Sequence, residues 1–247
     1  MDFPGVGTAL NVATVVVGAL LGMLVGGRLP QHTRSVVTDV LGLVTLLMAG
    51  FSAAAAADSA LAHAVGRGAM LIVLGSLLIG GIAGSLLRIE ERLAGLAGRI
   101  QARTHGRGGF PERERFIEGW LGATLLFCVG PLTILGALDD GMGNGIDKLA
   151  LKSVLDGFAA MAFAASFGIG VLLSAVSVLV IQGALTVAAV FLGTILSAAQ
   201  VSALTATGGL MLVGIGLRLL EIKHIPVGDL LPALVVAPLL TALVAAL

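Results

Sequence analysis

Residues 157–217 read GFAAMAFAASFGIGVLLSAVSVLVIQGALTVAAVFLGTILSAAQVSALTATGGLMLVGIGL and contain no aspartate, glutamate, lysine or arginine. A helix needs about 20 predominantly apolar residues to cross the hydrocarbon core of a bilayer. This run is therefore far too long for one span. It predicts the end of one membrane helix followed by two complete membrane helices.

The composition of the whole chain indicates the same class of protein. Of its 247 residues, 57% are hydrophobic and only 11% are charged, whereas a soluble domain carries about 25% charged residues. A water-soluble fold of this length has too little interior to hide so much apolar side chain. The sequence therefore predicts an all-α polytopic membrane protein whose first partner is the lipid bilayer.

The remaining counts exclude several kinds of site. The 14 basic and 14 acidic residues balance, whereas a nucleic-acid-binding surface needs a basic excess. One cysteine excludes a disulfide framework, and four histidines without HxH or HxxxH spacing give no support for a metal site. No cofactor is expected. The acidic start MDFPGVG lacks the pattern of a cleaved signal peptide, so the first apolar segment is expected to be a retained span.

Charge-free runs along the chain give eight expected spans. The expected spans are residues 3–27, 40–57, 68–87, 119–138, a fifth ending near 170, 174–198, 202–219 and 230–247. The separation of the fifth span from the sixth depends on a turn near Gly168–Ser174. Without that turn the count is seven.

The basic residues predict how the spans are oriented. With the N-terminus outside, eleven basic residues lie in inner loops, seven of them arginines between Arg88 and Arg115, and only three lie outside. Loops rich in lysine and arginine stay on the cytoplasmic side of the membrane. We therefore expect both termini outside, which requires an even number of spans and favours eight.

A single transmembrane domain over residues 1–247 is expected to have four parts. These are a three-helix unit at 1–87, a cytoplasmic amphipathic helix and loop at 88–115, a central helix pair at 116–170 and a second three-helix unit at 171–247. The segment RIEERLAGLAGRIQAR, at the start of the loop, is interpreted either as an interfacial regulatory helix or as a structural helix on the inner membrane face.

The two three-helix units resemble each other. The first begins NVATVVVGALLGMLVGG at Asn11, and the second begins QGALTVAAVFLGTILSA at Gln182. Because the first and sixth spans run in opposite directions, the pattern is typical of the inverted repeats of secondary transporters. Each amide, Asn11 or Gln182, is expected either to bond a neighbouring helix or to line a substrate pathway.

Small residues repeat every fourth position in two spans. The stripes are Gly18, Gly22 and Gly26 in the first span and Ser76, Gly80 and Gly84 in the third. Such stripes let helix backbones approach closely in a membrane, where no hydrophobic effect drives helices together. They predict close packing within one subunit or between subunits of a homo-oligomer.

The fourth span contains Gly130–Pro131 at its middle, in the stretch GWLGATLLFCVGPLTILGALDDG. Proline lacks an N–H group and leaves the carbonyl of Phe127 without its helical partner. In a bilayer such a carbonyl must meet protein, water or a ligand. Cys128, Gly130, Pro131 and Thr133 are therefore candidate groups lining a substrate pathway, and a plain proline kink is the alternative.

Few charges lie close to the spans. Asp156 is expected one to two turns inside the fifth helix, with Lys152 one turn before it, where an i,i+4 pair would reduce the cost of burial. Asp139 and Asp140 end the preceding span on the same side. These three carboxylates could attract a cation or carry a proton at the mouth of one cavity. The alternative for Asp139 and Asp140 is a solvated loop.

Several stretches together resemble a bacterial family of multi-pass membrane proteins, the domain of unknown function 554. The matching stretches are GTALNVATVVVGALLGMLVGGRLP (7–30), LLRIEERLAGLAG (86–98), LLFCVGPLTILGALDDG (125–141), KSVLDGFAAMAFAASFGIGV (152–171) and IPVGDLLPALVVAPLL (225–240). The resemblance implies a multi-pass protein of the bacterial cytoplasmic membrane, often presumed a transporter. It provides no catalytic or binding residues to carry over.

Transport of a small solute or ion is the function that these features favour. The pathway is expected near the broken fourth helix and the fifth helix. A channel lined by the same residues, or a structural or regulatory membrane protein, are the alternatives. An enzyme is not expected, because the chain has no HExxH or GxSxG motif and no aspartyl pair within one span.

Overall fold

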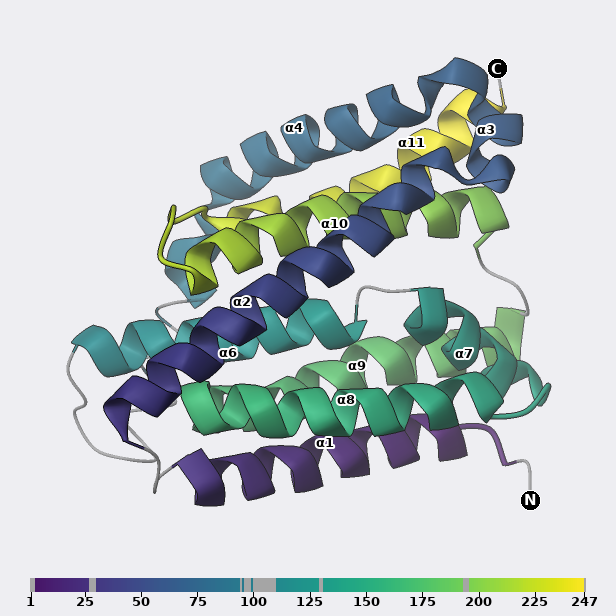
Figure 1. The fold of residues 1–247 in the computed structure, drawn as a ribbon. Coiled ribbons are helices and arrows are strands. Elements are labelled where there is room, and N and C mark those ends of the chain that lie inside the picture. The colour runs from purple at the N-terminus through teal and green to yellow at the C-terminus, as the bar shows by residue number, and fades with distance from the viewer. Residues whose placement is uncertain are drawn as a thin grey trace. The chain divides into compact units, whose positions relative to one another are not determined.

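The fold is taken from a computed structural model that describes residues 3–26, 30–93, 95, 99, 110–128, 131–192 and 196–246. All regular secondary structure in these ranges is helical, which confirms the predicted all-α class. The elements, shown in Figure 1, are α1 (Val6–Gly26), α2 (Gln31–Ala53), η1 (Ala54–Ala57), α3 (Ser59–Val65), η2 (Gly66–Gly68), α4 (Ala69–Leu87), α6 (Phe110–Cys128), α7 (Pro131–Met142), α8 (Asp147–Phe167), α9 (Ile169–Leu192), α10 (Ala198–Leu219), η3 (Val227–Leu230) and α11 (Ala233–Ala245).

The described helices fit the predicted number of spans. Seven helical segments are long and apolar enough to cross a membrane, and the number is eight if α6 and α7, which are bent by 59° at their break, count as one span. Gly168 separates the fifth span from the sixth: its φ of +65° ends α8, and its N–H donates to the Ala164 carbonyl. The turn on which the count of eight depended is therefore present.

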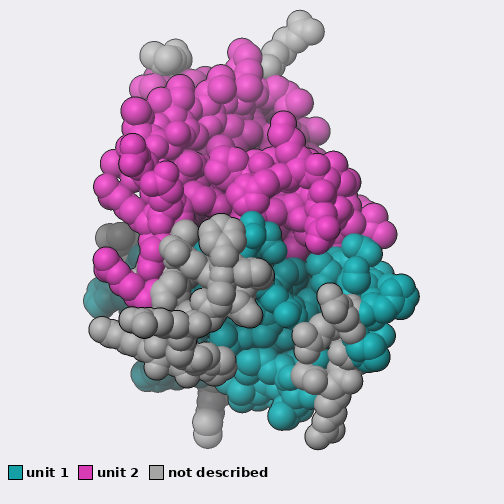
Figure 2. All heavy atoms as spheres, turned by 90° about the vertical axis from the view of Figure 1, so that its left-hand side faces the viewer, with its two compact units in different colours: residues 1–41, 107–195 teal, residues 42–106, 196–247 magenta. Residues whose placement is uncertain are grey.

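The chain divides into two compact units, coloured separately in Figure 2. Unit 1 comprises the described parts of residues 1–41 and 107–195, and unit 2 those of 42–106 and 196–247. Each unit thus combines an early and a late piece of the chain. These boundaries follow contacts in space and cut across the sequential parts 1–87, 88–115, 116–170 and 171–247, which remain a prediction about repeats.

In unit 1, α1 lies directly against α8 (Figure 1). A Cβ atom added to Gly18, Gly22 or Gly26 would collide with the backbone of Gly157, Met161 or Ala165, respectively. The residue numbers of the contacting positions increase together along α1 and α8, so the two helices run parallel. The glycine stripe predicted from the sequence is therefore filled within this chain, and it permits backbone contacts that larger residues would prevent.

The broken pair α6–α7 passes along most of α9 within unit 1. Gly170, at the start of α9, touches the backbone of Phe116, and Ser177 accepts a hydrogen bond from the Trp120 indole over 2.9 Å. Farther along, Gly141 of α7 packs against the Thr186 backbone near the other end of α9. The contacts with α9 therefore move steadily along α9 from α6, before the break, to α7, after it. A single broken span would give this order of contacts.

Unit 2 contains two antiparallel helix pairs. Gly80 and Gly84 of α4 pack against Ala233 of α11 and Asp229 of η3, so this second small-residue stripe is also filled within the chain. Gly42 of α2 packs against Leu220, which follows α10.

The predicted inverted repeat makes three pairs of helices equivalent. They are α1 with α9 in unit 1, and, in unit 2, α4 with α11 and the part of α2 from Gly42 onward with α10. Contacts join the two members of each pair within their unit: Thr8 to Gly183, Gly42 to Gly216, and Gly80 to Ala233. The inverted repeat itself remains a prediction from the sequence.

Candidate functional site

A buried ion pair lies halfway along α8. Asp156 is the tenth of the 21 residues of the helix, about 14 Å from its start at 1.5 Å per residue. Its carboxylate pairs with the Lys152 ammonium, and the two residues are 7% and 5% exposed. The predicted i,i+4 pair is therefore present, but it lies deeper in the span than the one to two turns expected from the sequence.

The order of the two charges does not favour the helix itself. Lys152 lies in the second turn of α8, near the positive end of the helix dipole, where a cation is unfavourable. An acidic residue preceding a basic one at i,i+4 is also more stabilising than this reverse order. Burial of the two charges also costs several kcal/mol of desolvation per ion. Stabilisation of α8 therefore does not explain why the sequence contains this buried pair.

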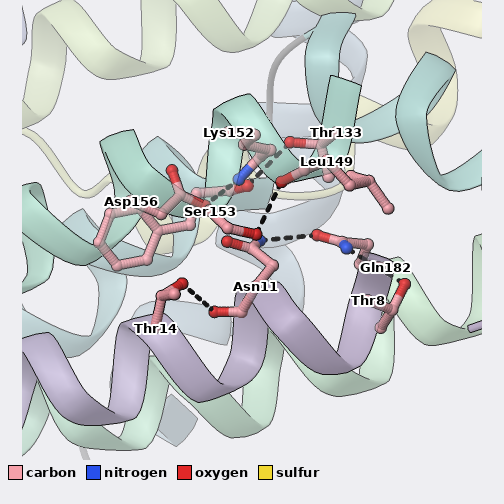
Figure 3. A network of polar contacts seen from close by, with 10 residues as sticks. Thr8, Asn11, Thr14, Thr133, Leu149, Lys152, Ser153, Asp156 and Gln182 are labelled. Carbon is pink, nitrogen blue, oxygen red and sulfur yellow. Dashed lines mark hydrogen bonds and ion pairs between the residues drawn. The ribbon is translucent and has the colours of Figure 1, made fainter. Parts of the chain in front are cut away.

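A chain of polar side chains joins α1 to α9 beside this pair (Figure 3). The Asn11 amide donates to Gln182 Oε1 over 2.9 Å, and Gln182 Nε2 donates to Thr8 Oγ1 over 3.1 Å. The Thr8 hydroxyl bonds the Thr186 hydroxyl at 2.9 Å. Asn11 and Gln182 are both 0% exposed. The two amides predicted separately from the sequence thus form one contact.

Asn11 connects this polar chain to the ion pair. Its side chain lies close to the Asp156 carboxylate where α1 packs against α8 (Figure 3). Asn11 Oδ1 is buried and accepts no hydrogen bond from any described residue. Buried polar atoms are nearly always paired, so this oxygen is an acceptor available for a ligand beside Asp156.

The break between α6 and α7 lies next to the same charges. The Phe127 carbonyl, predicted to lose its helical partner, accepts a hydrogen bond from Thr133 Oγ1 over 2.8 Å. Cys128 is buried, and its thiol interacts electrostatically with both Lys152 and Asp156. Gly130 lies outside the described residues. The backbone of Pro131 begins α7, while its side chain is also outside them.

The other two predicted carboxylates have different partners. Asp140 is buried and accepts hydrogen bonds from the backbone N–H groups of Gly5 (3.1 Å) and Thr8 (3.2 Å), so it caps the first turn of α1. Asp139 pairs with the partly exposed Lys148. The structure therefore does not gather Asp139, Asp140 and Asp156 around one ligand, and only Asp156 lies at the middle of a span.

The loop 88–115 is described only in part, mostly at its start. Glu90 accepts hydrogen bonds from the Arg218 guanidinium (2.8 Å) and the Gly228 N–H (2.6 Å) within unit 2. Its own N–H donates to the Asp229 carboxylate over 2.9 Å. The first turn of the expected amphipathic helix is thus tied to the end of α10 and to η3. Most of the rest of the predicted helix lies outside the described residues.

Comparison with known proteins identifies the family. Residues 6–242 match the family described as "Protein of unknown function (DUF554)". The chain belongs to this family. It is 32% identical over 245 residues to "Uncharacterized protein YqgA" of Escherichia coli (strain K12), with 96% of each chain covered. It is 26% identical over 233 residues to "Uncharacterized membrane protein YdfK" of Bacillus subtilis (strain 168), with 94% of this chain and 93% of the other covered.

Membership in the DUF554 family confirms the resemblance predicted from the sequence, and with the apolar helices it supports a membrane protein. No solved structure matches the chain. Sequence reasoning missed Thr8 and Thr186, although each lies on the same helical face as a predicted amide, three residues before Asn11 and four after Gln182. That spacing was the available signal.

Proposed function

We propose that this DUF554 protein is a membrane carrier for a small solute or ion, with its pathway at the α6–α7 break and the middle of α8. The observation that carries the proposal is the buried Lys152–Asp156 pair halfway along a span. Charged residues at this depth are expensive and mark ion or substrate pathways. A carrier, unlike an enzyme, needs no nucleophile or general base there.

The helix architecture supports a carrier. Transporters built from inverted repeats bind their substrates near the middle of the membrane, beside discontinuous helices. Here Cys128, the last described residue before the break, lies near Lys152 and Asp156, and the two predicted repeats are expected to run in opposite directions. The eleven basic residues assigned to inner loops favour both termini on the outer side of the bacterial cytoplasmic membrane.

Electrophysiology on a solid-supported membrane tests the proposal. Vesicles containing the purified protein receive jumps of sodium chloride, potassium chloride, sodium acetate, sodium phosphate or glycine. We expect at least one jump to give a protein-dependent transient current that Asp156→Asn abolishes. The matched control Asp139→Asn changes the surface pair with Lys148 and should keep the current. An equal current in Asp156→Asn rejects the pathway, and sustained single-channel currents would indicate a channel.

A further inference from the structure

The surroundings of Asp156 hold little charge. Among the described residues, Lys152 on the same helix pairs with its carboxylate, and the buried Cys128 thiol of α6 lies near both groups. Neither α1 nor α9, which pack against α8, contains an aspartate, glutamate, lysine, arginine or histidine.

The other two helices that contact α8 carry their charges toward their ends. Those of α6 extend up to Glu118, and those of α7 are Asp139, which pairs with Lys148, and Asp140, which caps α1. At the middle of α8, one carboxylate is thus paired with one ammonium.

One neutral oxygen without a hydrogen-bond partner among the described residues, Asn11 Oδ1, lies near the Asp156 carboxylate (Figure 3). Asn11 Oδ1 is completely buried, and the Asn11 side chain lies close to Asp156. In the structure, Gln182 directs its Nε2 to Thr8 and its Oε1 to the Asn11 amide, so Gln182 gives Asn11 Oδ1 no donor. A proton on Asp156 or a metal cation beside it would supply the missing partner. A divalent ion is disfavoured because such ions draw on several carboxylates.

We propose that Asp156 and Asn11 Oδ1 bind a monovalent cation, a sodium ion or a proton, and that Lys152 occupies the carboxylate when this cation is absent. The ammonium and the cation compete for the same carboxylate oxygens. The inference rests on the proposed function, since it assigns the coupling ion of that pathway. Cation binding itself can be measured without any transport.

If the cation and the Lys152 ammonium compete for Asp156, removing the ammonium should tighten cation binding. A purely structural ion pair predicts no such effect. Lys152→Met leaves Asp156 uncompensated in a buried site, which is strongly destabilising. A cation that binds Asp156 removes this penalty, so the variant should bind the cation at least about tenfold more tightly than the wild type does. A structural pair would leave the variant destabilised whatever cation is present.

Thermal unfolding of the full chain in detergent tests the proposal. Wild type, Lys152→Met, Asp156→Asn and Asn11→Ala are compared in sodium, potassium and choline chloride at equal ionic strength and over a range of pH. The pair Lys148→Met and Asp139→Asn provides the matched surface control. Stabilisation depends on cation concentration relative to Kd, so the melting temperature reports binding.

Two results support the proposal and distinguish the cations. A sodium-dependent rise in Tm that is largest in Lys152→Met, weaker in Asn11→Ala and absent in Asp156→Asn identifies a sodium ion. The same pattern on lowering the pH, with no effect of sodium, identifies a proton. A wild-type Tm that responds to neither, or a response that persists in Asp156→Asn, overturns the site.

Equilibrium binding of radioactive sodium, and proton uptake measured with a pH indicator, provide a second readout on the wild type if Lys152→Met does not fold. The absence of both from the wild type also overturns the site. Cation binding without any current in the vesicle assay would contradict the proposed transport function and leave the cation site intact.

Discussion

Asn11 of α1 donates a hydrogen bond to Gln182 of α9 over 2.9 Å, and both side chains are completely buried. The predicted repeat places these two residues at equivalent positions in two antiparallel spans. Hydrogen bonds between membrane helices contribute about 0.6 kcal/mol on average and up to about 1.7 kcal/mol. The contact therefore has a coupling energy that can be measured.

A double-mutant cycle measures that coupling. Asn11→Ala and Gln182→Ala should each lower the free energy of unfolding, and the double variant should lose about 1 kcal/mol less than the sum of the two. Unfolding in mixed micelles by a denaturing detergent provides the energies. Additive losses would show that the two amides do not stabilise each other.

The cap that Asp140 provides for α1 gives a second prediction. Asp140→Ala removes the acceptor for the N–H groups of Gly5 and Thr8 and should cost about 1 kcal/mol, as loss of an N-cap does. Asp140→Asn keeps a carbonyl oxygen and should cost less. The comparison uses the same unfolding assay, and equal losses in both variants would contradict the capping role.

The number and places of the spans could be predicted because the bilayer imposes a simple rule on composition. The ends of helices were less predictable. The charge-free run began the fourth span at residue 119, whereas α6 begins at Phe110. A helix continues into water past the hydrocarbon core, and an apolar count does not detect that part.

The neighbours of each span could not be predicted from hydropathy. The sequence suggested a unit of the first three spans, but α1 packs against α8 and α9 in unit 1. A glycine stripe shows that a close neighbour exists without showing which helix it is. For the same reason Asn11 and Gln182 were predicted as polar groups in separate spans, while the Lys152–Asp156 pair, which lies on one helix, could be predicted from spacing alone.

The hydroxyl of Thr133 gives a third prediction. It satisfies the Phe127 carbonyl that the proline break leaves free. Thr133→Val has nearly the same shape but no donor, so the buried carbonyl loses its partner at a cost of about 1–3 kcal/mol. Thr133→Ser keeps the donor and should unfold close to the wild type. If Val and Ser behave alike, the hydroxyl does not stabilise the break.

The Asp58 carboxylate should make the thermal stability of the protein depend on pH. It caps α3 and lies outside the spans, and its pKa is lowered mainly by the Ala60 N–H and next by the Ser202 hydroxyl. A lowered folded pKa means that this contribution is present above the ordinary value of 3.8 and is lost as the pH falls through the folded pKa. The Tm difference between wild type and Asp58→Ala should therefore shrink on acidification. A difference that stays constant would contradict the charged cap.

Two glycine-to-alanine substitutions should have opposite effects. Gly22 faces the Met161 carbonyl of α8, and an added Cβ would collide with it, so Gly22→Ala should separate α1 from α8 and destabilise unit 1. Overpacking of this kind costs about 1–3 kcal/mol. Gly50 of α2 has open space around it, and Gly50→Ala should stabilise the helix by up to about 1 kcal/mol, since alanine is the better helix former. Unfolding energies of the two variants give the comparison. A neutral or stabilising Gly22→Ala would show that the backbones of α1 and α8 are not in close contact at Gly22.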